Sequence, residues 1–390
     1  MTTRAEAVGG PIVTPGTRAF LGVFGLGALL IVWRLFAGLG ATTGLNDGYP
    51  LGLWIAFDVV TGTALACGGY AMALLVFVFN RGRYHSMVRP ALLTSALGYS
   101  LAGFGVMLDV GRWWLVWKVP VYFWHWNFNS ALLEIALCIM AYVVVLWIEL
   151  APAFFEKFAE GAPSALQRFS QAALPVLEKA AVWVIALGML LPTMHQSSLG
   201  TLMLLAGVRL HPLWNTPLLP LLFLISCISM GYAAVVFEAA LSSLAFKRAP
   251  ETSMLGTLAG IIVPLQIVYV VVRLADLAFR GRLGLLFADD MRAAMVWIEL
   301  VLALAPAAML APVAGRRDLG RLFRAALVLM FAGAVYRFDT YLVAFTPGAH
   351  WSYFPTVPEM GVTVGLVAFE VLAYVAIVKT FPILSGRTLR

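Results

Sequence analysis

The sequence predicts an all-α polytopic membrane protein with about ten transmembrane helices. Hydrophobic residues make up 62% of the chain and charged residues only 12%, and the mean hydropathy is +0.92, far outside the usual balance of a soluble domain. A spanning helix needs about 20 apolar residues, and backbone amides in hydrocarbon must be bonded within their own element, so helices are expected. The predicted spans are residues 17–39, 51–80, 88–109, 128–152, 178–195, 217–245, 252–279, 291–312, 322–345 and 357–381.

The chain has no soluble domain, linker or low-complexity stretch, so we expect a single integral membrane domain over residues 1–390. Its longest predicted connections are 110–127, 153–177, 196–216 and 346–356, and residues 200–211 could form a short re-entrant or surface helix. Three of the four connections are rich in Trp, Tyr, Pro and His. Two interpretations stay open for them, an aromatic belt at headgroup level or a docking surface for a periplasmic subunit.

The placement of basic residues predicts the orientation, because cytoplasmic loops are enriched in Lys and Arg. With the N-terminus inside, 17 basic residues lie on the cytoplasmic side and 6 on the other. The 17 are Arg4, Arg18, Arg81, Arg83, Arg89, Lys157, Arg168, Lys179, Lys247, Arg248, Arg316, Arg317, Arg321, Arg324, Lys379, Arg387 and Arg390. We therefore expect a bacterial inner-membrane protein with both termini cytoplasmic. The net charge of +7 is then a topology signal and gives no reason to expect nucleic-acid binding.

The cysteines and histidines argue against metal centres built by this chain alone. Cys67, Cys138 and Cys227 stand singly inside predicted helices, as packing residues do, so no iron–sulfur cluster or structural zinc is expected. Four histidines fall in predicted loops and His195 at a predicted helix end, so a bis-histidine haem is not expected. Any redox chemistry therefore needs metal centres from a partner.

Ionisable groups inside the predicted spans are the candidate functional residues. An unpaired charge there costs roughly 2.5–3.5 kcal/mol on insertion scales, so these groups should pair or face a polar cavity. Interhelical ion pairs that only fix packing are the alternative, and arginines near helix ends can also extend to the interface. The predicted layer, roughly 10–15 Å below the outer surface, contains Asp58, Tyr99, Glu134 and Glu299, with Arg34, Arg273 and Arg337 at comparable or shallower depth.

Two smaller sets support this layer. Asp109 and Arg112 could form an i,i+3 pair at the mouth of the third predicted helix, more a clamp than a catalytic element. Glu238, Glu370 and Glu149 lie deeper and could extend a proton route from the cytoplasm, although Glu149 also suits a simple interfacial position.

Several ordered stretches of the chain together form a recognisable pattern. They are Trp54-Ile55-Ala56-Phe57-Asp58, Phe79-Asn80-Arg81-Gly82-Arg83-Tyr84-His85, Gly98-Tyr99-Ser100-Leu101, Asp109-Val110-Gly111-Arg112, Leu191-Pro192-Thr193-Met194-His195-Gln196-Ser197-Ser198, His211-Pro212-Leu213-Trp214 and Tyr353-Phe354-Pro355-Thr356. These stretches resemble the HybB-type membrane subunits of respiratory nickel–iron hydrogenases, within the wider NrfD/polysulfide-reductase membrane-anchor family. The similarity extends from about residue 20 to residue 384.

The resemblance implies a haem-free subunit that exchanges electrons with a membrane quinone, menaquinone or ubiquinone. It implies docking to a periplasmic four-cluster iron–sulfur protein and, through it, to the large and small subunits of a nickel–iron hydrogenase. It also implies that predicted helices 2 to 5, about residues 51–195, form the quinone-site bundle, with Tyr99 and Glu134 in functional positions, while helices 6 to 9, about 217–345, form a second bundle.

The resulting hypothesis gives each candidate residue a role. Tyr99 or His195 hydrogen-bonds a quinone carbonyl, Glu134 with Asp58 delivers protons, and Asp109, Arg112 and Glu238 support the site. No metal ligand is expected. Four alternatives stay open: the membrane subunit of a polysulfide reductase, that of a nitrite reductase, a purely structural anchor, and a proton-coupled transporter, for which paired broken helices and an internal repeat would be expected.

Overall fold

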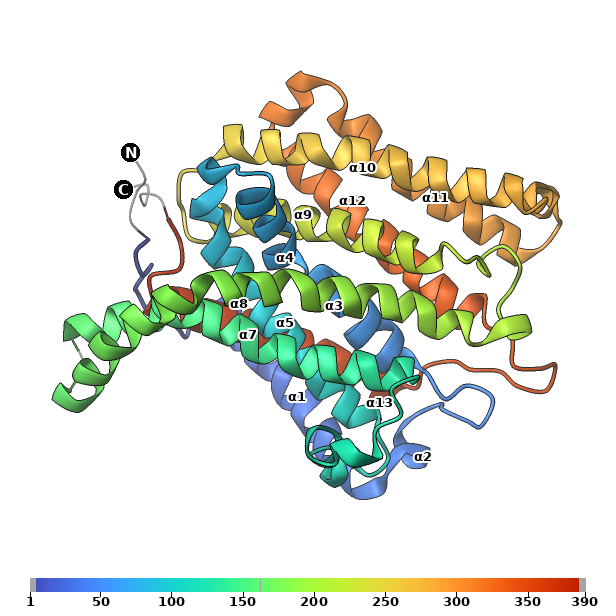
Figure 1. The fold of residues 1–390 in the computed structure, drawn as a ribbon, viewed down its shortest axis with the longest axis horizontal. Coiled ribbons are helices and arrows are strands. Elements are labelled where there is room, and N and C mark those ends of the chain that lie inside the picture. The colour runs from blue at the N-terminus through green and yellow to red at the C-terminus, as the bar shows by residue number, and fades with distance from the viewer. Residues whose placement is uncertain (1–4, 162, 386–390) are drawn as a thin grey trace.

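The computed structural model describes residues 5–161 and 163–385, and Arg4, Arg387 and Arg390 lie outside them. Over the described residues the fold consists of helices and two isolated β-bridges (Figure 1). Ten helices there are long and apolar enough to cross a membrane, which confirms the predicted fold class and the predicted number of spans. They are Pro15–Ala37 (α1), Trp54–Val78 (span 2), Gly82–Asp109 (η3 and α5, Val88–Asp109), Ala131–Gly161 (α7), Ser164–Leu204 (α8), Leu219–Ala245 (α9), Thr252–Phe279 (α10), Met291–Leu310 (α11), Leu319–Val343 (α12, Leu319–Phe338, and η9, Asp339–Val343) and Val357–Thr380 (α13).

Span 2 is the central and least regular helix. It consists of a π-helical segment η1 (Trp54–Thr61), α3 (Gly62–Leu65), α4 (Gly68–Ala73) and a second π-helical segment η2 (Leu74–Val78). In the most hydrophobic 18-residue stretch of span 2, 83% of the residues are buried, whereas the corresponding share in α8 is 6%. Span 2 therefore lies in the interior and α8 at the edge. At the break between α3 and α4, span 2 packs closely against α9. A Cβ on Gly231 of α9 would lie only 2.5 Å from the Cys67 carbonyl oxygen.

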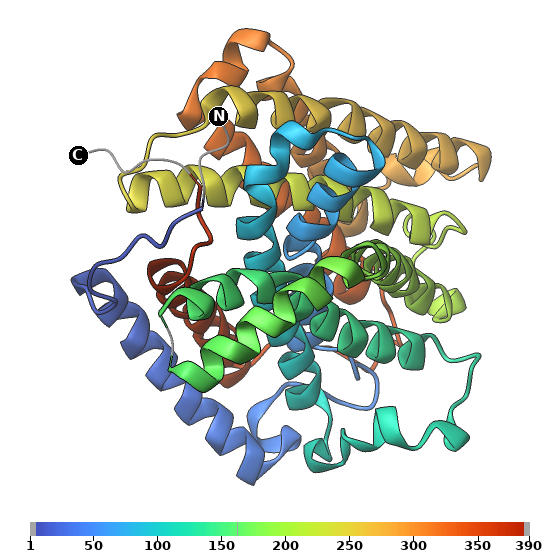
Figure 2. The same cartoon turned by 60° about the vertical axis from the view of Figure 1, so that its left-hand side comes forward.

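The ten spans pack as two groups of four with an additional pair. Span 2, α5, α7 and α8 form the first bundle, and α9 to α12 with η9 form the second. Contacts of α9 with α4 and α8 join the two bundles. Helices α1 and α13 pair with each other, where Gly27 and Gly365 bring their backbones together, and α13 packs on α5 (Figures 1 and 2).

The two ends of the described chain lie on one face, here called the terminal side, where Glu6 and Leu384 form a β-bridge (Figures 1 and 2). The predicted connection 153–177 on this side is wrong, because α7 continues to Gly161 and α8 starts at Ser164, forming a protruding helical hairpin (Figure 1). Its base is tied down by the two guanidinium nitrogens of Arg89, which bond the Glu156 carboxylate at 2.9 and 2.5 Å.

The opposite face, here called the loop side, carries the longer connections. A bridge between Leu210 and Phe345 joins two of them, and short helices interrupt the aromatic connection before α7: η4 (Trp113–Leu115), α6 (Lys118–Val121) and η5 (Phe123–His125). The predicted connection 196–216 is partly wrong, because α8 continues without a break to Leu204. Residues 200–204 thus belong to a membrane span, and only η6 (Gly207–Arg209) remains of the expected short helix.

Candidate functional site

A buried aromatic and polar cluster occupies the centre of the first bundle. The Tyr99 ring of α5 lies edge-on to the Tyr142 ring of α7, with centroids 4.5 Å apart, and 5.7 Å from the His195 ring of α8. The Tyr99 hydroxyl lies 3.4 Å from the sulfur of Cys67, at the break in span 2. None of these four side chains is more than 1% exposed. The cluster therefore unites all four helices of the first bundle.

Close backbone packing places Tyr99 in this cluster. A Cβ added to Gly98 would lie 2.6 Å from the Ala66 Cβ, so α5 approaches span 2 at a distance that only glycine permits. Tyr99 and Cys67 directly follow these two residues and are thereby set side by side. The expected helix-end position of His195 is wrong, since α8 continues for nine more residues to Leu204 and His195 lies fully buried in its interior.

A hydrogen-bonded chain connects His195 to a buried arginine of the second bundle. The His195 Nε2 and the Gln196 Nε2 lie 3.2 and 3.0 Å from the Thr63 hydroxyl oxygen. The Gln196 Oε1 accepts from the Arg337 Nη2 at 3.2 Å. The Arg337 guanidinium is fully buried and also donates to the Val60 carbonyl at 3.0 Å. Sequence reasoning did not single out Thr63 or Gln196, although Gln196 follows His195 directly in a polar stretch.

Glu134 does not touch this cluster. It is the fourth residue of α7, in the first turn at the loop side, and only half-buried, so it lies shallower than predicted because the helix starts at Ala131 rather than residue 128. Glu134, Cys138 and Tyr142 follow each other at intervals of four residues and therefore share one face of α7. At about 1.5 Å per residue, Glu134 lies about 12 Å along the axis from Tyr142.

Asp58 lies on another side of α5, in the wall of a large cavity. Its carboxylate accepts a hydrogen bond from the Thr363 hydroxyl of α13 at 2.9 Å, and a Cβ on Gly105 would lie 3.2 Å from the Asp58 Cβ. The cavity has a volume of about 700 Å³ and lies between α1, span 2, α5, α9, α12 and α13. This volume is within the range of about 300–1,000 Å³ that small-molecule sites have. Asp58 too is shallower than predicted, as the fifth residue of η1.

Three carboxyl groups line this otherwise mostly apolar cavity, those of Asp58, Glu238 and Glu370. The Tyr374 hydroxyl of α13 donates to the Glu238 carboxylate. Gly62, Ala66 and Gly98 also line the cavity, and they directly precede Thr63, Cys67 and Tyr99. A single layer of helix backbone therefore separates the cavity from the Tyr99 cluster. Glu238 and Asp58, expected at different depths, thus share one space that the sequence did not predict.

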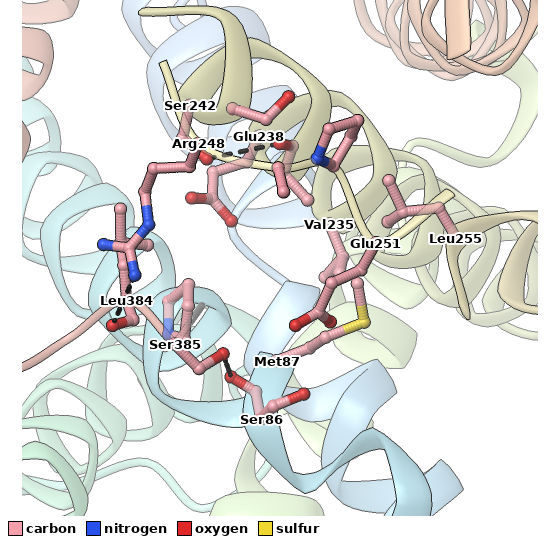
Figure 3. Close-up of a pocket in the computed structure, with 15 residues that line it drawn as sticks. Ser86, Met87, Val235, Glu238, Ser242, Arg248, Glu251, Leu255, Leu384 and Ser385 are labelled. Atoms are coloured by element: carbon pink, nitrogen blue, oxygen red, sulfur yellow. Dashed lines mark hydrogen bonds between the residues drawn. The ribbon is translucent and has the colours of Figure 1, made fainter. Parts of the chain in front are cut away.

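A smaller pocket of about 60 Å³ opens on the terminal side next to Glu238 (Figure 3). Glu238 and Ser242 of α9 line both spaces. Figure 3 shows Arg248 bonded to the Leu384 carbonyl oxygen and Glu251 on the pocket wall. Burial raises the pKa of the Glu251 carboxyl, against the opposing influence of the Ser86 hydroxyl and the Arg248 guanidinium. The pocket therefore connects the terminal surface with a cavity carboxyl.

The proposed Asp109 and Arg112 pair is wrong, and neither an ion pair nor a hydrogen bond joins them in the described structure. Helix α5 ends at Asp109, and Val110 is extended with φ −75° and ψ 125°, so Arg112 leaves the helix and the i,i+3 geometry is lost. Arg34 of α1 takes its place beside Asp109, and its Nη2 donates to the Val110 carbonyl at 2.9 Å. Arg34 is 1% exposed and so does not extend to the interface.

The second bundle contains its own buried charge cluster. Arg273 of α10 and Glu299 of α11 form an ion pair at 3.4 Å, and neither side chain is more than 2% exposed. The Trp214 indole N–H donates to the other Glu299 oxygen at 2.8 Å. Asp339, which sequence reasoning missed although it follows Arg337 by two residues, lies close to Glu299. The ion-pair interpretation therefore describes Arg273 and Glu299 but not Arg337, which bonds only neutral groups.

The Tyr99 cluster offers a phenol hydroxyl and an imidazole among aromatic side chains, groups that can hydrogen-bond carbonyl or hydroxyl oxygens on an apolar ring. The His195 Nδ1 is buried and makes no hydrogen bond within the described residues, so one hydrogen-bonding position of the ring is unused there. Groups of three or more Cys, His, Asp or Glu side chains suited to a metal are absent from the described part of the chain.

Comparison with known proteins agrees with the resemblance. The family model described as "Polysulphide reductase, NrfD" matches residues 42–339. The chain is 42% identical to the "Probable Ni/Fe-hydrogenase 2 b-type cytochrome subunit" of Escherichia coli (strain K12), over 98% of this chain and 96% of the relative. It is 28% identical to the "Menaquinone reductase, integral membrane subunit" of Nitratidesulfovibrio vulgaris, over 94% of this chain and 90% of the relative. A second protein of Nitratidesulfovibrio vulgaris is 31% identical, over 96% of this chain and 95% of the relative. The chain, with its ten spans and full-length similarity, therefore belongs to the NrfD family of polysulphide-reductase-type membrane proteins.

Proposed function

We propose that this protein is the quinone-reactive membrane subunit of a periplasm-facing nickel–iron hydrogenase complex. The observation that carries the proposal is the buried Tyr99 and His195 pair with its orphaned imidazole nitrogen, in a chain so similar to a hydrogenase subunit. A related protein is named a menaquinone reductase subunit, which supports a quinone as the lipid-soluble partner. The chain would pass electrons between a partner iron–sulfur protein and the quinone.

The orientation proposed from the sequence assigns the terminal side to the cytoplasm and the loop side to the periplasm. On the loop side, the connection before α7 exposes large aromatic side chains. Trp114, Trp117 and Trp124 are 56%, 53% and 61% exposed, and Phe128 is 84% exposed. We propose this aromatic surface as the docking site of the periplasmic four-cluster iron–sulfur protein. That protein would transfer the electrons that the hydrogenase large and small subunits release. An aromatic headgroup belt remains the alternative for the same residues.

We propose that the subunit acts without haem. The name of the Escherichia coli relative contains the term b-type cytochrome, but a bis-histidine haem needs two axial ligands facing each other. His195 is the one histidine in the interior of a long apolar helix in the described structure, and its Nε2 is engaged with Thr63. An absorption spectrum of the purified complex, taken with and without dithionite, tests this point.

Proton exchange with the quinone would use the carboxyl groups on either side of the cluster. Glu134 lies on the α7 face that leads from the loop side to Tyr142, and Asp58 lies in the cavity that reaches Glu238 near the terminal side. A positioned acid or base typically contributes about 100-fold or more to a proton-transfer step. Uptake through Glu238 from the cytoplasm would couple quinone reduction to charge movement, whereas uptake past Glu134 would be electroneutral.

The test is hydrogen-dependent reduction of a soluble naphthoquinone by membranes that contain the whole complex. We expect Tyr99→Phe and Glu134→Gln to lose at least about tenfold in rate while hydrogen-dependent dye reduction, which needs only the hydrogenase subunits, stays unchanged. Glu156→Gln on the same helix is the matched control, because that residue lies in the terminal-side hairpin. Unchanged quinone reduction in both test variants would make the subunit a structural anchor.

A further inference from the structure

The protonation pattern of the His195 ring follows from the hydrogen bonds around it. Its Nδ1 makes no hydrogen bond within the described residues, while its Nε2 lies 3.2 Å from the Thr63 hydroxyl oxygen. A neutral imidazole has one nitrogen that donates and one that accepts, and its partners determine which is which. The Thr63 hydroxyl can in principle either donate or accept, so its own partners decide the question.

Arg337 determines the orientation of the Gln196 amide. A guanidinium has only donors, so the Gln196 atom 3.2 Å from the Arg337 Nη2 must be the carbonyl oxygen. The Gln196 amide nitrogen then points at Thr63 and donates to its hydroxyl oxygen at 3.0 Å. The Arg337 guanidinium also donates hydrogen bonds to the carbonyls of Val60 and Phe223, at 3.0 and 3.2 Å, and these bonds fix its position.

The single hydrogen of the Thr63 hydroxyl is already engaged. The hydroxyl oxygen lies 2.6 Å from the Val59 carbonyl oxygen, which can only accept. Thr63 therefore donates to Val59 and accepts from Gln196, and no hydrogen remains for His195. The bond between Thr63 and His195 must then be donated by the His195 Nε2, which leaves Nδ1 as an unprotonated acceptor.

We infer that Arg337, Gln196 and Thr63 are positioning residues that hold His195 as the Nε2–H tautomer, so that its Nδ1 accepts a hydrogen bond from a ligand hydroxyl. The inference rests on the proposed quinone function and refines it. It reverses one part of the hypothesis drawn from the sequence, because neutral His195 in this tautomer cannot donate to a quinone carbonyl. Tyr99, whose hydroxyl has a hydrogen, remains the candidate donor.

The division of roles gives a balanced proton transfer. Oxidation of a quinol releases two electrons and two protons, and the electrons pass to the iron–sulfur clusters of the partner. One proton leaves a quinol hydroxyl for the His195 Nδ1, so the ring then carries hydrogens on both nitrogens. The second proton leaves the other hydroxyl for the carboxyl groups of Glu134 or Asp58, to which the proposed function assigns proton exchange. In the direction of quinone reduction the same proton returns from Nδ1 to the ring oxygen of the ligand.

The tautomer itself can be measured without any quinone chemistry. Membranes containing the whole complex with ¹⁵N-labelled histidine would be studied by solid-state NMR, and the His195→Gln variant would assign the signals by difference. We expect His195 to be protonated at Nε2 and unprotonated at Nδ1 in the wild type and in Thr63→Ser, which keeps the hydroxyl. Thr63→Val removes the acceptor, and its His195 signals should show a shift of the proton towards Nδ1. A wild-type ring protonated at Nδ1 would overturn the inference.

The ligand role is tested by quinol oxidation with an artificial electron acceptor for the hydrogenase side. A neutral hydrogen bond contributes roughly fivefold to an equilibrium, so Thr63→Val should weaken quinol oxidation by about that factor or more, and Thr63→Ser should restore it. His195→Asn can place an amide oxygen near the Nδ1 position and should retain more activity than His195→Gln. Quinol oxidation at the wild-type rate in His195→Gln would overturn the ligand role, and a loss in Tyr99→Phe would still support the proposed function.

Discussion

Replacing Arg273 by methionine tests how the second bundle carries its buried charges. Arg273 and Glu299 lie 3.4 Å apart in a site that is almost closed to solvent. With an effective dielectric constant of about 20, their Coulomb attraction is about 5 kcal/mol, most of which offsets the loss of hydration of the two ions. Removing only the cation leaves a buried carboxylate without compensation, which costs about 3–5 kcal/mol.

The reverse change should be much milder. Glu299→Gln keeps an oxygen that can accept from the Trp214 indole, and Asp339 remains nearby as a counter-charge for Arg273. We therefore expect Glu299→Gln to cost about 1 kcal/mol or less, in the range of a single net hydrogen bond. The contrast between the two variants, rather than either value alone, tests the assignment of Asp339 as a second counter-charge.

The cysteines provide the assay. Cys67, Cys138 and Cys227 are buried, so a maleimide fluorophore reacts with them only when the protein unfolds. Purified variants in detergent would be heated in the presence of this dye, and unfolding by a denaturing detergent would give the free-energy differences. Leu274→Met on the same helix controls for the introduction of methionine. Equal losses of stability in Arg273→Met and Glu299→Gln would refute the reasoning, as would the absence of a loss in Arg273→Met.

Three further predictions concern packing, the surface and pH. Gly27→Ala should destabilise the protein by about 1–3 kcal/mol, because its Cβ would lie 2.6 Å from the α13 backbone, whereas Gly25→Ala, with open space around it, should be neutral in the same thermal assay. Arg89→Gln should cost less than about 1 kcal/mol, and the cost should shrink further in high salt, because Arg89 and Glu156 are each about one-third exposed. Burial, together with the nearby Arg292 guanidinium, lowers the pKa of His211 below its usual range. Unfolded His211 then binds a proton more readily than the folded one, so stability should be complete above about pH 6.5 and fall at lower pH; a His211→Asn variant with the same slope between pH 7 and 5 would contradict this.

The number and type of the helices follow from the sequence alone. The hydrocarbon core of a membrane imposes a minimum apolar length and forbids unbonded backbone, so ten apolar runs predict ten helices. Where the prediction fails, it fails at helix ends, within residues 153–177 on the terminal side and over 196–204 on the loop side. Residues 153–161 and 164–177 are polar enough to resemble a loop, yet they form helix because the α7 and α8 hairpin supports itself by packing.

Residue type also identified the candidate functional side chains, but it did not predict which of them pair with each other. Asp109 seemed matched to Arg112 by spacing, whereas the end of α5 separates them and a distant arginine, Arg34, comes beside Asp109. Asp58 and Glu238 are 180 positions apart in the chain and share one cavity, since α5, α9 and α13 leave space between them. Spacing along a helix reports one face of that helix, while the partner on that face comes from interhelical packing.

The sequence by itself therefore determined the membrane class, the spans and the candidate residues, because hydropathy and charge act locally along the chain. Only the tertiary structure decided that Arg337 of the second bundle orients Gln196, that Gln196 and Val59 occupy the Thr63 hydroxyl, and that His195 keeps a free acceptor. The physical reason is that hydrogen-bond donors and acceptors must be matched in three dimensions, and these partners come from helices far apart in the chain.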